Sequence, residues 1–152
     1  MKKNILLITV LTTFLAFTFY SNCKKKENNN SQEQSQTTNE NYSFGVGPIQ
    51  SKIELGPVDD ALAQKGEKLF NEKCTACHKI EERYVGPAIK GVTVRRTPEW
   101  IMNMILNPME MTQKDPQAKE LLAQYLTQMT NQNVSQEDAR AILEYFRKID
   151  SK

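Results

Sequence analysis

The chain has 152 residues, of which 39% are hydrophobic and 25% charged, with 20 Lys and Arg side chains against 18 Asp and Glu. This length allows one domain with appended segments. Lys2 and Lys3 lie in a segment that we expect to be removed, which leaves equal numbers of basic and acidic side chains. No Lys and Arg cluster is interleaved with aromatic residues, so the composition argues against a nucleic-acid partner.

The first 22 residues are typical of an export signal. A short basic start precedes the mostly apolar run 5–20, which is short for a membrane span. Cys23 follows directly and resembles the lipid-modified cysteine of a bacterial lipoprotein signal, although two flanking residues are unusual for one. The alternatives are ordinary secretion and an uncleaved anchor helix. We expect residues 1–22 to be a lipoprotein-type signal peptide and Cys23 to carry a lipid, since more than one acyl chain anchors a protein stably.

Two different segments follow the signal. Residues 28–41 contain only Asn, Ser, Gln, Thr and Glu, which cannot bury enough apolar area to offset the entropy lost on ordering. We therefore expect 23–41 to be a lipid-anchored, disordered polar tether. Residues 42–58 carry several apolar side chains among glycines and prolines. This content predicts an extended arm that lies against the domain at 59–152.

The domain at 59–152 is predicted to be all-α, with four helices and no convincing strand. Each helix start has a capping side chain, and two starts have proline at the first helical position. The stretch 79–94 is predicted to be a loop. The expected helices run from Asp59 or Asp60 to about Thr75 or Cys77, from Thr97-Pro98 to Asn107-Pro108, from Asp115-Pro116 onward, and from the capping box Ser135-x-x-Asp138 through Ile149.

The first helix leads into Cys74-Thr75-Ala76-Cys77-His78, the C-x-x-C-H pattern that attaches a c-type haem. Each thiol can bond to one vinyl group of the porphyrin, and this brings the adjacent imidazole to the iron. A thioredoxin-like dithiol would need a βαβ setting, whereas the flanks here are helical. A zinc site needs about four ligands, but the chain has one histidine and three cysteines. We predict one covalent haem c on Cys74 and Cys77, with His78 as an axial ligand.

The second axial position has several candidates. There is no second histidine, and a Met thioether is the usual partner in electron transfer. Met102 and Met104 lie inside a predicted helix, where core packing is the ordinary role. Met109, Met111 and Met129 lie in or near loops, and spacing alone does not separate them.

A haem histidine usually donates its other ring N–H to a carbonyl group. Pro87 has a free carbonyl nine residues after His78, so it is a candidate for this role. The alternative is that Gly86-Pro87 only marks a turn. Spacing alone gives the two interpretations equal weight.

The domain resembles class I bacterial cytochromes c, particularly small lipoprotein cytochromes, over roughly residues 44–149. The resemblance implies an all-α fold of about four helices around one covalently bound haem. It also implies that Gly66 and Phe70 meet the terminal helix near Tyr145 and Phe146. It rests on Gly66 with Leu69-Phe70, the Cys74–His78 motif, Gly86-Pro87-Ala88 with Gly91, Arg95-Arg96-x-x-x-Trp100-Ile101, Asn107-Pro108, the run 129–135 and the terminal helix.

The same resemblance implies roles for single residues. The ligand methionine of such proteins lies just before the capped terminal helix, which corresponds to Met129, although Thr130 replaces the commoner proline. Pro87 would be the carbonyl partner of the axial histidine. A haem propionate is expected on Arg95, Arg96 or Trp100, with plain surface charge or core packing as the alternatives.

These features predict a membrane-tethered, monohaem electron carrier on the periplasmic side of a bacterial membrane, and not an enzyme. The expected partners are a quinol-oxidising complex and a terminal oxidase or reductase. One alternative is a haem peroxidase or gas sensor with an open iron. Another is a haem subunit docked on a larger oxidoreductase through the arm at 42–58. Because the porphyrin would supply much of a small core, we also expect the haem-free chain to be largely unfolded.

Overall fold

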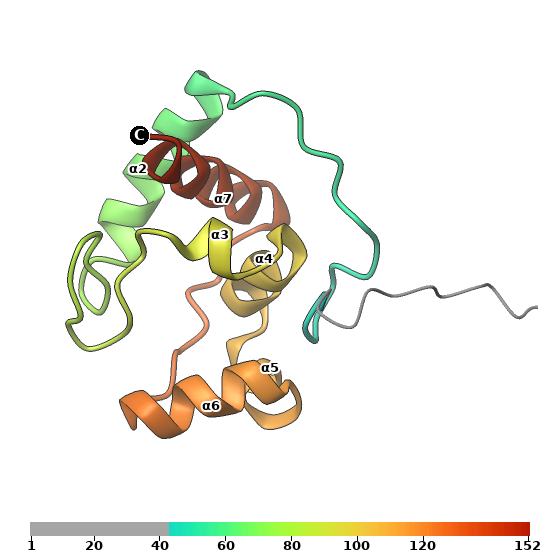
Figure 1. The fold of residues 1–152 in the computed structure, drawn as a ribbon, viewed down its shortest axis with the longest axis vertical. Coiled ribbons are helices and arrows are strands. Elements are labelled where there is room, and N and C mark those ends of the chain that lie inside the picture. The colour runs from blue at the N-terminus through green and yellow to red at the C-terminus, as the bar shows by residue number, and fades with distance from the viewer. Residues whose placement is uncertain (1–42) are drawn as a thin grey trace, which may run out of the picture. The chain divides into compact units, whose positions relative to one another are not determined.

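A computed structural model describes residues 43–152; the predicted signal peptide, the lipid on Cys23 and the polar tether lie outside the described residues. The described part is helical and has no strand, which confirms the all-α prediction (Figure 1). None of its helices has the length and apolar content to cross a bilayer. The helices are α2 (Asp60–Lys73), α3 (Val92–Arg95), α4 (Pro98–Leu106), α5 (Pro108–Lys114), α6 (Pro116–Tyr125) and α7 (Gln136–Asp150).

The four predicted helix starts are confirmed by their caps. In each, a side-chain oxygen accepts a backbone N–H of the first turn, which satisfies one of the donors that a helix leaves without an internal partner. The cap pairs are Asp59 with Leu62, Thr97 with Trp100, Asp115 with Ala118, and Ser135 with Asp138.

Three details differ from the prediction. The first helix ends at Lys73, earlier than expected, and Cys74 caps it. The expected loop contains the single turn α3 after Gly91, whose φ of +77° lies in the left-handed region. Helix α5 begins at Pro108, and Asn107 is both the C-cap of α4 and the N-cap of α5. A proline stops the preceding helix but has the right φ to start the next, and helices this short leave little periodicity to detect.

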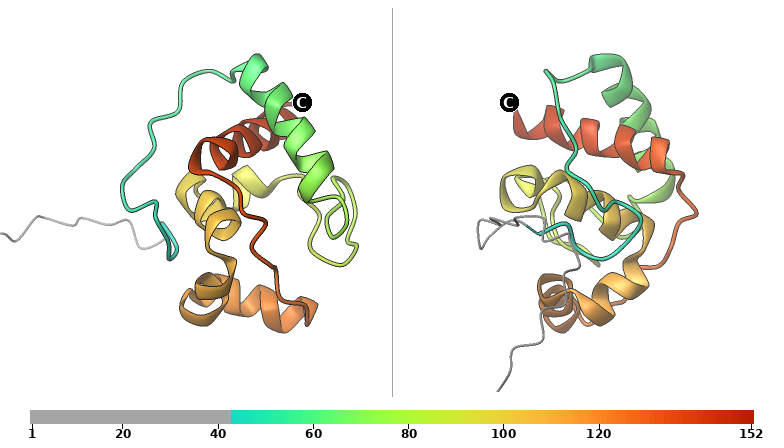
Figure 2. Two further views of the ribbon diagram at one scale, coloured as in Figure 1. Left: turned by 180° about the vertical axis from the view of Figure 1, so that it is seen from behind. Right: turned by 90° about the vertical axis from the view of Figure 1, so that its right-hand side faces the viewer.

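Helices α2 and α7 form the most extensive helix pair of the described part, and they cross in every view (Figures 1 and 2). Gly66 is buried at the crossing, where a Cβ atom would lie 2.0 Å from the carbonyl oxygen of Ala141. The ring centroid of Phe70 lies 5.7 Å from those of both Tyr145 and Phe146. The predicted crossing is therefore confirmed.

Replacing Gly66 with alanine should destabilise the protein by about 3 kcal/mol. The gain in helix propensity is only about 1 kcal/mol, whereas the new methyl group would force two helix backbones apart. Chemical denaturation of the haem-loaded protein measures the difference. Gly56→Ala is the control, since no atom lies within 4 Å of a Cβ built there. Equal stability of the two variants would contradict close backbone contact at the crossing.

The segment 43–58 has no helix or strand and runs along α4 (Figure 2, right). The Asn103 side chain is fully buried; its amide donates to the carbonyls of Phe44 (2.7 Å) and Ile49 (2.9 Å) and accepts the Ile49 N–H (2.9 Å). The buried Glu99, one turn earlier, accepts the Ile53 N–H. An extended segment without a sheet partner needs other groups for its backbone, and these two side chains supply them.

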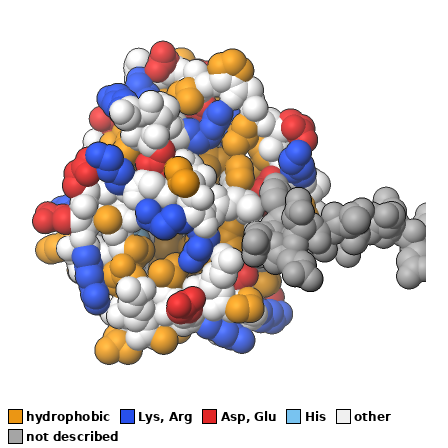
Figure 3. All heavy atoms as spheres, in the orientation of Figure 1, with side chains coloured by type: hydrophobic (Ala, Val, Ile, Leu, Met, Phe, Trp, Pro, Cys, Tyr) orange, Lys and Arg blue, Asp and Glu red, His pale blue; other side chains and the backbone are white. Residues whose placement is uncertain are grey.

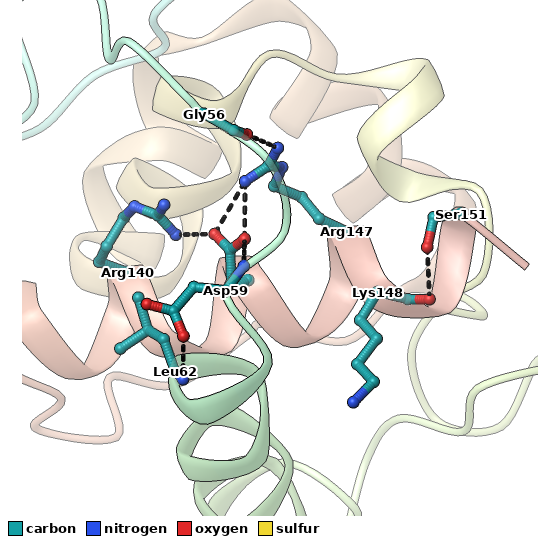
Figure 4. A network of polar contacts seen from close by, with 8 residues as sticks. Gly56, Asp59, Leu62, Arg140, Arg147, Lys148 and Ser151 are labelled. Atoms are coloured by element: carbon teal, nitrogen blue, oxygen red, sulfur yellow. Dashed lines mark hydrogen bonds and ion pairs between the residues drawn. The ribbon is translucent and has the colours of Figure 1, made fainter.

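The end of this segment is held by a buried carboxylate, Glu144 of α7. Figure 4 labels the residues that bind it, Asp59, Arg140 and Arg147. Glu144 accepts the Asp59 N–H at 2.9 Å and pairs with Arg140 and, at 2.7 Å, with Arg147. Arg147 also donates to the carbonyl of Gly56 at 2.6 Å. Burial alone would raise the pKa of Glu144, but the Asp59 N–H and the two guanidinium groups outweigh it and hold the pKa below its ordinary value.

This shift has a defined effect on stability. A carboxyl group whose pKa is lower in the folded state stabilises the fold above its unfolded pKa, and that contribution is lost as the pH falls through the folded pKa. The free energy of unfolding of wild type should therefore decrease as the pH is lowered from about 5 to about 3. In Glu144→Gln the free energy of unfolding should depend less steeply on pH over that range. Denaturation series of the two proteins measure the slopes. Parallel slopes would exclude Glu144 as a source of acid sensitivity.

Candidate functional site

A cavity of about 830 Å³ lies among the loop after α2, helices α3, α4 and α6, and the segment that leads to α7. Its volume lies within the range of roughly 300–1,000 Å³ that is common for small-molecule and cofactor sites. The surface has a hollow with hydrophobic side chains in it and Lys or Arg beside it (Figure 3). The apolar lining includes Phe70, Ile89, Val92, Trp100, Ile101, Met104, Ile105, Leu121, Leu122, Tyr125, Val134, Ile142 and Phe146.

The Cys74–His78 motif forms one tight turn at the end of α2. The N–H of Cys74 donates to the carbonyl of Phe70 at 2.8 Å, and the N–H groups of Cys77 and His78 donate to the carbonyl of Cys74 at 3.0 and 2.9 Å. Both thiols and the imidazole line the cavity, and both cysteines are free. Cys74 is partly buried, whereas Cys77 is exposed. The turn thus presents all three groups on one wall.

His78 is oriented by the loop that follows it. Its Nδ1 lies 3.0 Å from the carbonyl oxygen of Pro87, so the predicted contact is present. Because a carbonyl only accepts, the ring donates from Nδ1, and Nε2 is then the nitrogen that has a free lone pair when the ring is neutral. Gly86 makes this approach possible: its N–H donates to the Cys77 carbonyl at 2.8 Å, and a Cβ atom there would lie 2.5 Å from the imidazole.

The cysteine pair does not fit the two rival interpretations. Burial raises the pKa of Cys74 to about 11, whereas a reactive dithiol has a thiolate with a lowered pKa. Within residues 43–152, no three His, Cys, Asp or Glu side chains are grouped as a metal site would require. Neither a redox dithiol nor a zinc site is therefore supported by the described residues.

The structure distinguishes the candidate methionines, which spacing alone could not, by whether they line the cavity. Met129 lines the cavity. Met111 is fully buried away from it, and its sulfur accepts the N–H of Val46 at 2.9 Å. Met109 does not line the cavity either and is 48% exposed. Met104 lines the cavity from within α4, so Met129 is the cavity methionine that lies in a loop.

Among residues 43–152, no Asp or Glu lines the cavity, but four cationic side chains do: Lys73, Lys90, Arg95 and Arg96. Trp100 also lines it, but the indole N–H donates to the buried Asp115 carboxylate at 3.0 Å. Trp100 therefore serves as a wall of the cavity, and its only donor is not free for a propionate. The guanidinium of Arg96 lies 5.1 Å from the centroid of the Trp100 ring.

Sequence reasoning missed part of the lining. Leu121, Leu122 and Tyr125 of α6 line the cavity, and only the tertiary structure brings them there. The polar Thr112 and Gln128 gave no signal, because their contact joins residues 16 positions apart in the chain.

A model of the cytochrome c family matches residues 63–150, more than half of the chain. The chain belongs to the cytochrome c family. Cytochromes c are electron-transfer proteins with one covalently attached haem c, so this cytochrome carries that cofactor. The lining of the cavity fits this cofactor. Its apolar walls suit the face of the porphyrin, and its Lys and Arg side chains suit the haem propionates. The two thiols and the imidazole share one wall.

Solved structures support the assignment of this cytochrome. A cytochrome c from Rhodothermus marinus is 51% identical with a TM-score of 0.67, and the match covers 69% of this chain and 90% of that one. An engineered form of the same protein, bound to a carbene intermediate, is 48% identical with a TM-score of 0.65, covering 70% and 92%.

A curated relative matches this cytochrome over a shorter stretch. Cytochrome c-551 of Stutzerimonas stutzeri is 53% identical over 36 residues, which is 23% of this chain. The match spans only 35% of that relative's length. This match therefore supports the family assignment and gives no information on the rest of the chain.

Proposed function

We propose that this cytochrome is a membrane-tethered, monohaem one-electron carrier and not an enzyme. Cys74 and Cys77 would hold the haem through two thioethers, and His78 and Met129 would be the axial ligands. When bound, the haem supplies reversible one-electron chemistry between Fe(III) and Fe(II). The observation that carries the proposal is that one apolar cavity is lined by all four of these residues.

The chain's own residues favour a carrier in three ways. The Pro87 carbonyl fixes the ring of His78 and leaves Nε2 for the iron. Met129 would supply a thioether as the second ligand, which would raise the reduction potential and leave no open coordination position. The apolar walls keep water away from the haem, which also tunes the potential.

Electron exchange needs access to the haem edge, and the exposed Cys77 at the cavity wall supports such access. The proposed partners are a quinol-oxidising complex and a terminal oxidase or reductase. Redox encounters generally use small interfaces, and the nearly neutral charge argues against strong electrostatic steering. The arm is a poor docking element for a larger oxidoreductase, because its backbone is already bound to Asn103 and Glu99.

Three measurements on protein made with a cytochrome c maturation system test the carrier. We expect a covalent haem by mass, a reversible one-electron titration, and poor binding of carbon monoxide by the reduced protein, since both axial positions are filled. Rapid, tight carbon monoxide binding would indicate an open iron and favour a peroxidase or sensor. Elution of a detergent extract as one large complex would favour a docked subunit.

The membrane tether and the periplasmic location are proposed from the N-terminal sequence, with Cys23 as the lipidated residue. Globomycin, which blocks lipoprotein signal cleavage, should leave a larger precursor in cells. Radioactive palmitate should label wild type and not Cys23→Ser. Normal processing together with no label would contradict the lipid anchor.

A further inference from the structure

Met129 lies in a segment, 126–135, that has no helix or strand of its own. The segment begins at Leu126, which ends α6 with a φ of +53°, a conformation that is unfavourable for a residue with a branched side chain. Thr130 follows Met129, and its φ is not fixed as that of a proline would be. The local backbone therefore does little to hold Met129, and contacts with the rest of the domain must do so.

Such contacts flank Met129 on both sides. The amide of Asn131 donates to the carbonyl of Leu106 at 3.3 Å, a long bond from an exposed side chain. The contact before Met129 is shorter and better buried. The carbonyl of the Gln128 amide accepts the hydroxyl of Thr112 at 2.9 Å, and the NH₂ group of Gln128 donates to the backbone carbonyl of Met129, also at 2.9 Å.

Thr112 is well placed to serve as the fixed end of this chain of contacts. It is 6% exposed, lies in α5 and lines the cavity. The carbonyls of Pro108 and Met109 also lie 3.0 Å from the Thr112 oxygen, so its single proton is shared between them and Gln128. Both carbonyls belong to α5, so the position of the hydroxyl is defined by its own helix. Gln128 thus connects a buried helical side chain to the peptide group of Met129.

We propose that Thr112 is a positioning residue for the axial Met129, acting through Gln128. The two hydrogen bonds fix the backbone at Met129 and so keep its thioether at the iron. This inference rests on the proposed assignment of Met129 as the ligand. Losing one hydrogen bond of this kind typically changes an equilibrium by a factor of about 2 to 10, here the equilibrium between bound and released thioether.

Imidazole competes with a thioether for ferric iron, and its apparent affinity increases with the fraction of protein whose thioether is released. In the haem-loaded protein, Thr112→Val should therefore bind imidazole about 2- to 10-fold more tightly than wild type. Its far-red sulfur-to-iron charge-transfer band should weaken. Thr112→Ser, which restores the hydroxyl, should behave as wild type, and Thr112→Val with Gln128→Leu should add little to either change alone.

Thr93→Val is the matched control, since it removes a threonine hydroxyl that donates to Asp150 at 2.6 Å and does not line the cavity. It should lower the melting temperature without changing imidazole affinity. If Thr112→Val does not fold, Gln128→Leu alone tests the same link. Wild-type imidazole affinity in the folded variant would overturn the inference. A wild-type band that persists in Met129→Ala would instead overturn the ligand assignment on which the inference depends.

Discussion

Replacing Met129 with alanine should abolish the far-red sulfur-to-iron charge-transfer band of the oxidised protein. It should also lower the reduction potential and turn the reduced protein into a strong binder of carbon monoxide. The reason is that Met129, the loop methionine of the cavity, is the proposed axial ligand, and removing its thioether would open a coordination position. Optical spectra, a redox titration and carbon monoxide binding measure the three effects.

Met111→Ala is the control for this experiment. The Met111 side chain is fully buried outside the cavity, and its sulfur accepts the Val46 N–H. The band should therefore remain, while stability should fall by about 2–5 kcal/mol because a buried side chain is truncated. If the band survived in Met129→Ala and vanished in Met104→Ala, the ligand would lie on α4.

Replacing Cys74 and Cys77 together with serine should leave a haem-free protein that is largely unfolded. The chain encloses about 830 Å³ with mostly apolar walls. Without haem these apolar walls would face water, at a cost of roughly 25 cal/mol for each Å² exposed, and a domain typically has only about 5–15 kcal/mol of stability to lose. We therefore expect the walls to rearrange when the haem that would fill the cavity is missing.

Circular dichroism and thermal melting test this expectation. The helical signal of the double variant should fall below about half that of the haem-loaded protein, and no cooperative melt should remain. Hydrogen exchange should show little protection even at the crossing of α2 and α7, because Phe70 and Phe146 of that crossing also line the cavity. A cooperative, native-like melt would contradict the view that the porphyrin is a large part of the core.

The sequence by itself determined where the long helices begin. Asp59, Thr97, Asp115 and Ser135 cap their helices as predicted, because capping acts between residues two or three positions apart. It also contained the haem-attachment motif, because that chemistry lies within five consecutive residues. For the carbonyl partner of His78, spacing left Pro87 and a plain turn equally weighted, and the structure shows the Pro87 carbonyl 3.0 Å from Nδ1.

Only the tertiary structure shows that Met129 lines the cavity whereas Met109 and Met111 do not. It also shows that the indole of Trp100 donates to Asp115 and that Thr112 contacts Gln128. Met109, Met111 and Met129 are chemically alike, and only the packing of residue 46 on Met111 and the course of residues 126–135 separate them. Trp100 lines the cavity without offering it a donor, because its indole N–H donates to Asp115. These contacts join residues distant in the chain, and no local pattern of propensity or periodicity encodes which distant groups meet.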